Sequence, residues 1–209
     1  AHHVLLLSID TLRADMLRDP DRGRSDFPAL TELLAASTWF DRTFSTAAGT
    51  DLALACIVTG RWHPFVPVAT TLFEALAQDG RTIHAILPRE VLRYAGEPLL
   101  RRGTSTLDVI VSDRKQRDVA DHSTSDEVTD RALAALAQAD ADGKRGLVWA
   151  HYFDLHEHAQ LPLPAAASAL QASNDSAHVV RYRAQLRVID TAIGRLRREL
   201  TARGLAERT

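Results

Sequence analysis

The stretch His3-Val-Leu-Leu-Leu-Ser-Ile-Asp10 decides the fold of this chain. Its apolar run has the length of one β-strand. A strand buried on both faces carries such a continuous run, as in parallel sheets that are covered by helices. The run ends at Asp10, a polar residue. We therefore expect a buried parallel strand over residues 3–9, with polar side chains at its C-terminal end.

Further along the chain, segments with helical spacing of apolar residues alternate with short apolar segments of strand length. Glycines at 60, 80 and 204 follow three of the helical segments and are typical helix stops. The predicted helices cover 28–36, 50–59, 71–79, 125–139 and 177–203, and the other predicted strands cover 81–87, 107–111 and 147–153. This alternation favours an α/β domain with a mostly parallel central sheet and helices on both faces.

The composition is that of an ordinary soluble globular protein. The 209 residues are 45% hydrophobic and 25% charged, with a formal net charge of -2. The length fits one large domain over residues 1–209 better than two small ones. The nearly balanced charge argues against a nucleic acid as the partner.

Cys56 is the single cysteine, so an intramolecular disulfide and a multi-cysteine zinc site are both excluded. A lone cysteine fits an exported or a cytosolic protein, so the compartment stays open. The longest apolar runs, 4–9 and 52–58, are far too short to cross a bilayer. We expect no membrane segment in this chain.

Ligands bind beyond the C-terminal ends of parallel strands, and two polar clusters fall there, while a third candidate lies at a predicted helix N-terminus. Asp10 follows the first strand, where a carboxylate can bind a hard cation or can simply cap a turn. Thr50 opens the predicted helix 50–59, where its hydroxyl can act as a nucleophile next to a cation or can serve only as the N-cap.

The second polar cluster is His151-Tyr-Phe-Asp-Leu-His-Glu-His158, which follows the strand 147–153. Three histidines lie within eight residues, but their spacing matches no zinc motif. We expect one or two of them to face a ligand, while His151 packs at the strand end. The segments 112–124 and 160–176 are predicted loops, and the second is a candidate flap over the site.

Taken together and in this order, these motifs resemble the sulfatase family of the alkaline-phosphatase superfamily. The first strand through Asp15 resembles the opening strand with the first metal ligand. The segment from Phe40 to Arg61 resembles the one that carries the nucleophile and ends in Leu-Thr-Gly-Arg. The segment 149–156 is similar to the one whose histidine contacts the substrate, and 182–205 is similar to the helix that follows it.

The resemblance implies a role for four residues. Asp10 would be a metal ligand, Thr50 both a metal ligand and the nucleophile, and His156 a catalytic and substrate-binding group, with Asp154 also binding substrate. The cofactor would be a divalent metal, which is calcium, manganese, magnesium or zinc. The substrate would be a small-molecule, glycan or lipid phosphate or sulfate ester, and the family favours a periplasmic or extracytoplasmic location.

The sequence departs from the sulfatase pattern around the nucleophile. Sulfatases need cysteine or serine there for conversion to formylglycine, whereas this chain has Thr50, and Cys56 lies six residues away. Threonine instead resembles the phosphodiesterase and phosphotransferase branches, in which it is itself phosphorylated. The usual Pro-Ser-Arg after the nucleophile is replaced by residues 52–54, which are Leu-Ala-Leu.

The family's Asp-His metal pair, which follows the helix corresponding to 182–205, is absent from the sequence. We therefore expect a domain truncated before its last metal-ligand strand, with an open sheet edge through which copies could associate. A catalytically inactive fragment or binding module is the alternative to a phosphate- or sulfate-ester hydrolase or transferase. A nucleotide-binding domain is disfavoured because no Gly-x-Gly-x-x-Gly or Walker motif follows the first strand.

Overall fold

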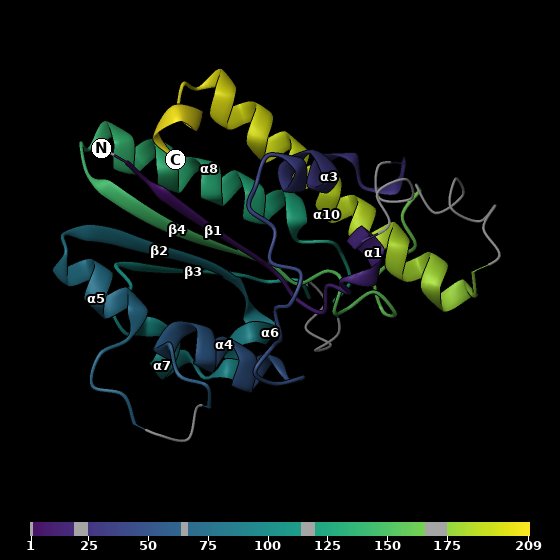
Figure 1. Cartoon of the computed structure of the whole chain (residues 1–209), viewed down its shortest axis with the longest axis horizontal. Coiled ribbons are helices and arrows are strands. Elements are labelled where there is room, and N and C mark those ends of the chain that lie inside the picture. Colours follow the sequence, from purple (N-terminus) through teal and green to yellow (C-terminus); the bar gives the residue numbers. More distant parts are fainter. Residues whose placement is uncertain (1, 19–24, 64–66, 114–119, 166–174) are drawn as a thin grey trace.

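The computed structural model describes residues 2–18, 25–63, 67–113, 120–165 and 175–209, and its centre is a four-stranded parallel sheet (Figure 1). Within the sheet the strand order is β1-β4-β2-β3, and every neighbouring pair is parallel. The strands are β1 (Val4–Ile9), β2 (Arg81–Pro88), β3 (Thr106–Ile110) and β4 (Arg145–Tyr152). The four predicted strands are confirmed to within two residues at their ends.

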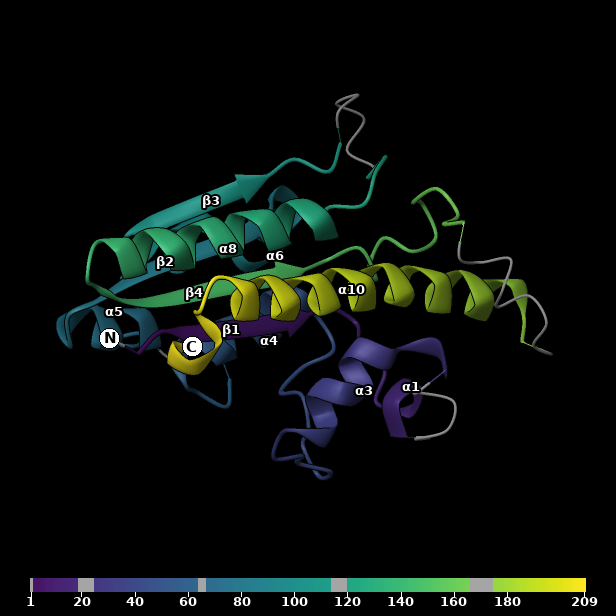
Figure 2. The same ribbon diagram turned by 90° about the horizontal axis from the view of Figure 1, so that it is seen from above.

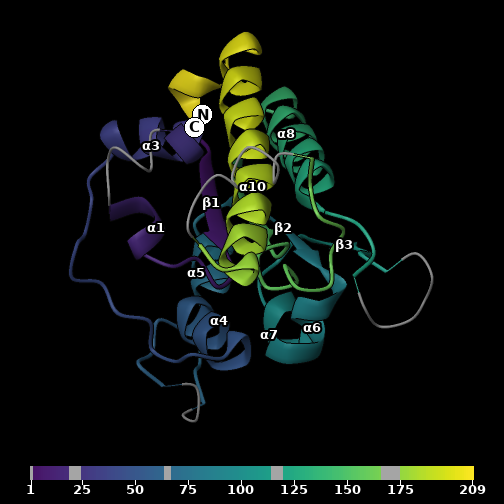
Figure 3. The ribbon, with the colours of Figure 1, turned by 90° about the vertical axis from the view of Figure 1, so that its right-hand side faces the viewer.

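Helices cover both faces of the sheet, as predicted (Figure 3). One face carries α8 (Ser125–Ala141) and α10 (Ala177–Ala202). The opposite face carries α4 (Thr50–Thr59), α5 (Leu72–Gln78), α6 (Arg89–Ala95) and α7 (Glu97–Arg101). Figure 2 shows α1 (Asp15–Arg18) and α3 (Pro28–Ala35) on the β1 side of α10, away from α8. A short 3₁₀ helix, Ala206–Arg208, follows α10.

The core has two halves because side chains alternate across each strand. On β4, Val148 and Ala150 pack under α8 and α10, whereas Leu147 and Trp149 pack toward α4 and α5. All four are almost fully buried. This explains the continuous apolar runs in the sequence, since both faces of the strand lie inside the protein.

The predicted helix at 50–59 is confirmed, but its first turn differs from the expectation. Gly49 is the N-cap, and Thr50 is the first residue of α4. The Thr50 side chain makes no capping bond, because its hydroxyl points to another residue described below. At the other end Gly60 closes the helix in the left-handed conformation, with φ of 64°. The helix α5 begins with a capping box formed by Thr71 and Glu74.

The strand β1 lies at one edge of the sheet and pairs with β4. Its residues are partly exposed, whereas those of β4 are buried after the first position. Beside this edge, Leu5 and Leu7 line a groove of about 950 Å³ between α3 and α10. The edge strands of the described sheet are β1 and β3, and the expected open edge and self-association through it stay predictions. In the described residues no helix has the length and apolarity to cross a bilayer.

A buried carboxylate joins α10 to α3. Asp190 is 3% exposed and accepts hydrogen bonds from the backbone N–H groups of Leu30, at 2.7 Å, and Ala29, at 3.3 Å. It therefore satisfies the free donors in the first turn of α3, which the local N-cap, Phe27, cannot do. A Cβ on Gly194 would meet Ala29 at 3.0 Å, so the two helices pack closely here.

Replacing Asp190 by alanine is expected to destabilise the fold by about 1–3 kcal/mol, because two N–H groups in the first turn of α3 lose their acceptor. Urea unfolding measures the difference. Glu199→Ala on the same helix is the control, since Glu199 forms an exposed pair with Arg203 and its loss is expected to cost less than about 0.5 kcal/mol. Equal effects of the two substitutions would contradict the capping role.

Candidate functional site

The C-terminal ends of β1 and β4 place Asp10 at the rim of the sheet. The Asp10 N–H donates to the Tyr152 carbonyl at 2.9 Å, which extends the β1–β4 pairing by one residue. Leu6 packs into the core half that contains α4. Because side chains alternate along a strand, Ser8 and Asp10 point to the same side. The carboxylate of Asp10 therefore faces the first turn of α4.

Thr50 meets Asp10 there. The Thr50 hydroxyl donates a hydrogen bond of 3.0 Å to Oδ2 of Asp10. Leu54 and Val58, one and two turns along α4, are buried in the core and fix the position of the helix. The backbone N–H groups of the first turn of α4 have no partners within the helix, so this end also favours a negatively charged ligand.

A chain of side chains from β4 reaches the same carboxylate. The indole N–H of Trp149 donates to Ser8 Oγ at 2.8 Å, and Ser8 Oγ lies 2.7 Å from Nδ1 of His151. Nε2 of His151 lies 3.4 Å from Oδ2 of Asp10. Ser8 Oγ thus accepts from Trp149 and also bonds Nδ1 of His151, which leaves Nε2 as the ring nitrogen that faces Asp10.

Electrostatics keep Asp10 ionised. Burial alone would raise its pKa, but the hydrogen bond and charge of His151, the hydrogen bond from Thr50 and the charge of His156 together bring the pKa below the usual value for aspartate. The side chain is 8% exposed. A buried carboxylate that is ionised at neutral pH is suited to accept a cation or to hold a donor in place.

The turn after Asp10 is strained. Thr11 has φ of 52°, and among the described residues other than glycine it alone has positive φ. A β-branched residue rarely adopts this conformation. Tyr182 on α10 holds the turn, because its hydroxyl donates to the Thr11 carbonyl at 2.8 Å and accepts from the Arg13 N–H at 2.9 Å. The long helix thus fixes the backbone that presents Asp10.

His156 lies in the loop that follows β4. Its ring stacks on Phe153, with centroids 4.4 Å apart, and also contacts Tyr94. Nδ1 lies 3.0 Å from a carboxylate oxygen of Glu157. That hydrogen bond, together with the charges of Asp10 and Glu157, raises the pKa of His156 above the usual histidine value, although partial burial opposes the shift. His156 is thereby a candidate proton donor close to Asp10.

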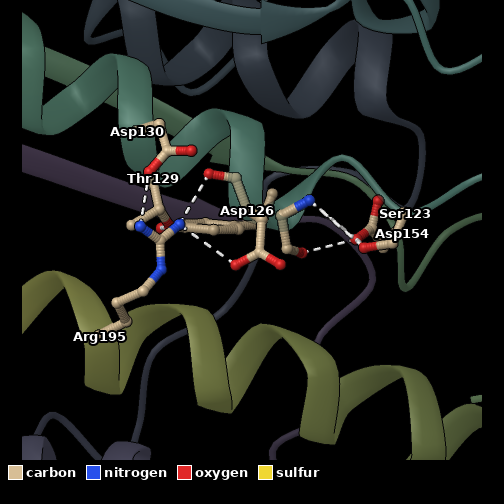
Figure 4. A network of polar contacts seen from close by, with 8 residues as sticks. Ser123, Asp126, Thr129, Asp130, Asp154 and Arg195 are labelled. Carbon is tan, nitrogen blue, oxygen red and sulfur yellow. Dashed lines mark hydrogen bonds and ion pairs between the residues drawn. The ribbon is translucent and has the colours of Figure 1, made fainter.

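The structure favours a structural role for Asp154 over the expected contact with substrate. Its side chain is 3% exposed and accepts hydrogen bonds from the N–H groups of Thr124, at 2.8 Å, and Ser125, at 3.1 Å. The hydroxyls of Ser123, Thr124 and Ser125 donate to it as well. Figure 4 shows this carboxylate at the start of α8, so it caps that helix and its oxygens are occupied.

The donors at Asp10 and Thr50 fit a divalent cation in kind. Adjacent oxygen ligands of a cation with bonds of about 2.1 Å lie about 3.0 Å apart, which is the separation of Asp10 Oδ2 and Thr50 Oγ1. Two ligands are fewer than the four to eight that such cations take. Within the described part of the chain, no group of three or more histidine, cysteine, aspartate or glutamate side chains could hold a metal ion.

Sequence reasoning named Asp10, Thr50 and His156, and the structure brings these three close together. It missed the hydrogen bond between Ser8 and His151. His151 was expected only to pack at the strand end. The signal was available, because Ser8 interrupts an apolar strand, and a polar residue buried there needs a partner. The predicted flap at 160–176 lies mostly outside the described residues.

Comparisons with known proteins bear on the family and the fold of this chain. The sequence profile of the family described as Sulfatase matches residues 2–209. No curated protein sequence matches the chain significantly. Among solved structures, the lipoteichoic acid synthase LtaP from Listeria monocytogenes superimposes with a TM-score of 0.75 and 13% identity, covering 98% of this chain and 53% of LtaP.

Two further structures are similar. The C-terminal periplasmic domain of EcEptC from Escherichia coli, in complex with zinc, has a TM-score of 0.68 and 14% identity, covering 97% of this chain and 61% of that one. BT4656, in complex with its substrate D-glucosamine-2-N,6-O-disulfate, has a TM-score of 0.65 and 14% identity, covering 100% and 64%. The chain thus spans 53–64% of the length of these structures.

The protonation of His156 offers a test of the site. NMR titration of the ring is expected to give a pKa above the usual histidine value, and Glu157→Gln is expected to lower it, because the principal hydrogen bond to the protonated ring is lost. Asp10→Asn is expected to lower it by less, since only a more distant charge is removed. A pKa that neither substitution changes would show that the ring does not face these carboxylates.

Proposed function

Because the chain belongs to the sulfatase family, we propose that it contributes the nucleophile, Thr50, to a metal-dependent hydrolase or transferase acting on phosphate or sulfate esters. The observation that carries the proposal is the 3.0 Å hydrogen bond from the Thr50 hydroxyl to Asp10, at the N-terminus of α4. It joins a potential nucleophile, a hard cation ligand and an anion-binding helix end.

Each residue has a definite task in this proposal. A divalent cation at the site would supply positive charge that lowers the pKa of a hydroxyl bound to it. Asp10 holds the Thr50 hydroxyl at the first turn of α4, and the hydroxyl proton passes to solvent when Oγ1 becomes the nucleophile. Oγ1 then attacks phosphorus or sulfur, while the bond to the leaving oxygen breaks and His156 gives that oxygen a proton. Water or an acceptor hydroxyl would release the group from Thr50.

The identity of the nucleophile favours phosphate esters over sulfate esters. Threonine cannot become formylglycine, whereas it can carry a phosphoryl group itself. Among the similar structures, LtaP is by name a lipoteichoic acid synthase, and BT4656 is bound to a sulfated glucosamine. The names and ligands belong to those two proteins. For this chain they suggest a lipid-linked or glycan ester as the first substrate class to test.

A second candidate function is a catalytically inactive binding or structural module. It is favoured by one observation, which is that the described residues contain no group of three or more histidine, cysteine, aspartate or glutamate side chains that could hold a metal ion. In an active protein the remaining ligands would be water, substrate oxygens or residues outside these 209. The two functions differ in whether the site binds a cation tightly.

Turnover of p-nitrophenyl phosphate, bis-p-nitrophenyl phosphate and p-nitrophenyl sulfate with added manganese, magnesium, calcium or zinc tests the proposal. Thr50→Ala is expected to reduce turnover by about 10³-fold or more, and Thr50→Ser to retain part of it, because serine keeps the hydroxyl. Mass spectrometry should find a phosphoryl adduct on the peptide that contains Thr50 in the active protein.

Activity that Thr50→Ala leaves unchanged would exclude Thr50 as the nucleophile. Thr59→Ala is the matched control, since Thr59 lies at the other end of α4 and its hydroxyl bonds the Ala55 carbonyl. If no ester is cleaved and calorimetry detects no manganese binding to the 209-residue protein, the inactive module is supported instead.

A further inference from the structure

A small pocket next to the Asp10 turn contains three histidines that come from two distant segments. It has a volume of about 280 Å³. Two of the histidines follow β4, and the third lies in the first turn of α10. The lining residues are Thr11, Arg13, His156, His158, His178, Val179 and Tyr182. The function proposed above uses only His156, which leaves His158 and His178 without a role.

The ring of His158 is held in one tautomer. Nδ1 lies 2.8 Å from the Leu155 carbonyl oxygen, which can only accept, so Nδ1 carries the proton. Nε2 therefore has a free lone pair. The ring also packs edge-on against Tyr182, with centroids 5.4 Å apart. A backbone carbonyl that fixes the far nitrogen of a histidine is the arrangement that usually supports a metal-bound imidazole.

His178 faces this lone pair. The two Nε2 atoms are 3.1 Å apart, and the rings meet nearly at right angles, at 68°. Without a cation, His178 can donate its proton to His158. Two nitrogens that each lie about 2.0–2.1 Å from one zinc ion would be separated by 3.1 Å when the angle at the metal is about 100°. The pair is therefore spaced like two neighbouring ligands of a single ion.

We propose that His158 and His178 form a second metal site, which binds a transition metal of the zinc, nickel and copper class. Imidazole nitrogens favour these ions over magnesium or calcium, which prefer oxygen. These nitrogen donors differ in kind from the oxygens of Asp10 and Thr50. Metal binding by the two histidines does not require metal binding at Asp10 and Thr50.

The remaining coordination positions of such an ion face the pocket. Two histidines leave at least two positions of a tetrahedral ion open. Nearby Arg13 is paired with Asp15 through two hydrogen bonds, at 2.6 and 3.0 Å. Because at least two positions stay open, water or the oxygen of an anionic ligand can complete the coordination of the ion, next to His156. The site would also tie the loop after β4 to the start of α10.

Calorimetric titration with zinc and with nickel tests this site on the 209-residue protein. His178→Gln is expected to weaken the binding at least about ten-fold, since one of two protein ligands is lost. His178 is exposed, so the substitution should leave the fold intact, which circular dichroism verifies. Asp10→Asn removes the oxygen donor of the other site and should leave this binding unchanged. His63→Gln, at an exposed histidine elsewhere, is the control.

Ring resonances provide a second readout. Adding zinc should shift the signals of His158 and His178 together, and in His158→Gln the shift at His178 should be lost or greatly reduced. The proposal is overturned if the wild-type protein binds neither ion at tens of micromolar, if His178→Gln binds as tightly as wild type, or if Asp10→Asn alone abolishes the binding. The second result leaves the Thr50 mechanism untouched, and the first excludes zinc but not manganese, magnesium or calcium at Asp10 and Thr50, so the two proposals fail separately.

Discussion

The parallel register of β1 and β4 is the constraint on which the candidate site depends. It pairs Ser8 with His151 and Ile9 with Tyr152, so that the polar side chains of both strands face α4. A slip of one residue would turn Asp10 away from Thr50 and would leave Ser8, His151 and the Trp149 indole without their partners. The register is itself fixed by burial, since the side chains of β4 fill both halves of the core. The packing of the core and the geometry of the candidate site therefore depend on the same β1–β4 pairing.

The fold could be predicted from the sequence because its signals are local. Apolar runs mark the strands, Gly60 and Gly80 mark helix ends by their backbone conformation, and Thr71 marks a helix start by its side-chain cap. The position of Asp10 followed from the rule that sites lie beyond the ends of parallel strands. The role of Asp154 could not be predicted, because it depends on three residues some thirty positions earlier. The contact of Tyr182 with the Thr11 turn joins residues 171 positions apart, and no local pattern indicates it.

Two kinds of ligand chemistry meet at this edge of the sheet. Oxygen donors from β1 and α4 meet at a helix N-terminus, and three histidines line the pocket that also contains Thr11 and Arg13. Tyr182 contacts both the strained Thr11 turn and the ring of His158. A ligand that orders the start of α10 would thus act on the segment that presents Asp10. Strain of this kind persists only where the surrounding structure holds it, as α10 does here.

Asp10 and Thr50 are proposed to bind a divalent cation together. The most direct measurement is anomalous diffraction from crystals soaked in manganese, which locates the ion without reference to activity. We expect a peak about 2.2 Å from both Asp10 Oδ2 and Thr50 Oγ1, with the Thr50 hydroxyl turned from hydrogen bond to metal ligand. An empty position between these two atoms at millimolar manganese, with their 3.0 Å hydrogen bond intact, would contradict the claim.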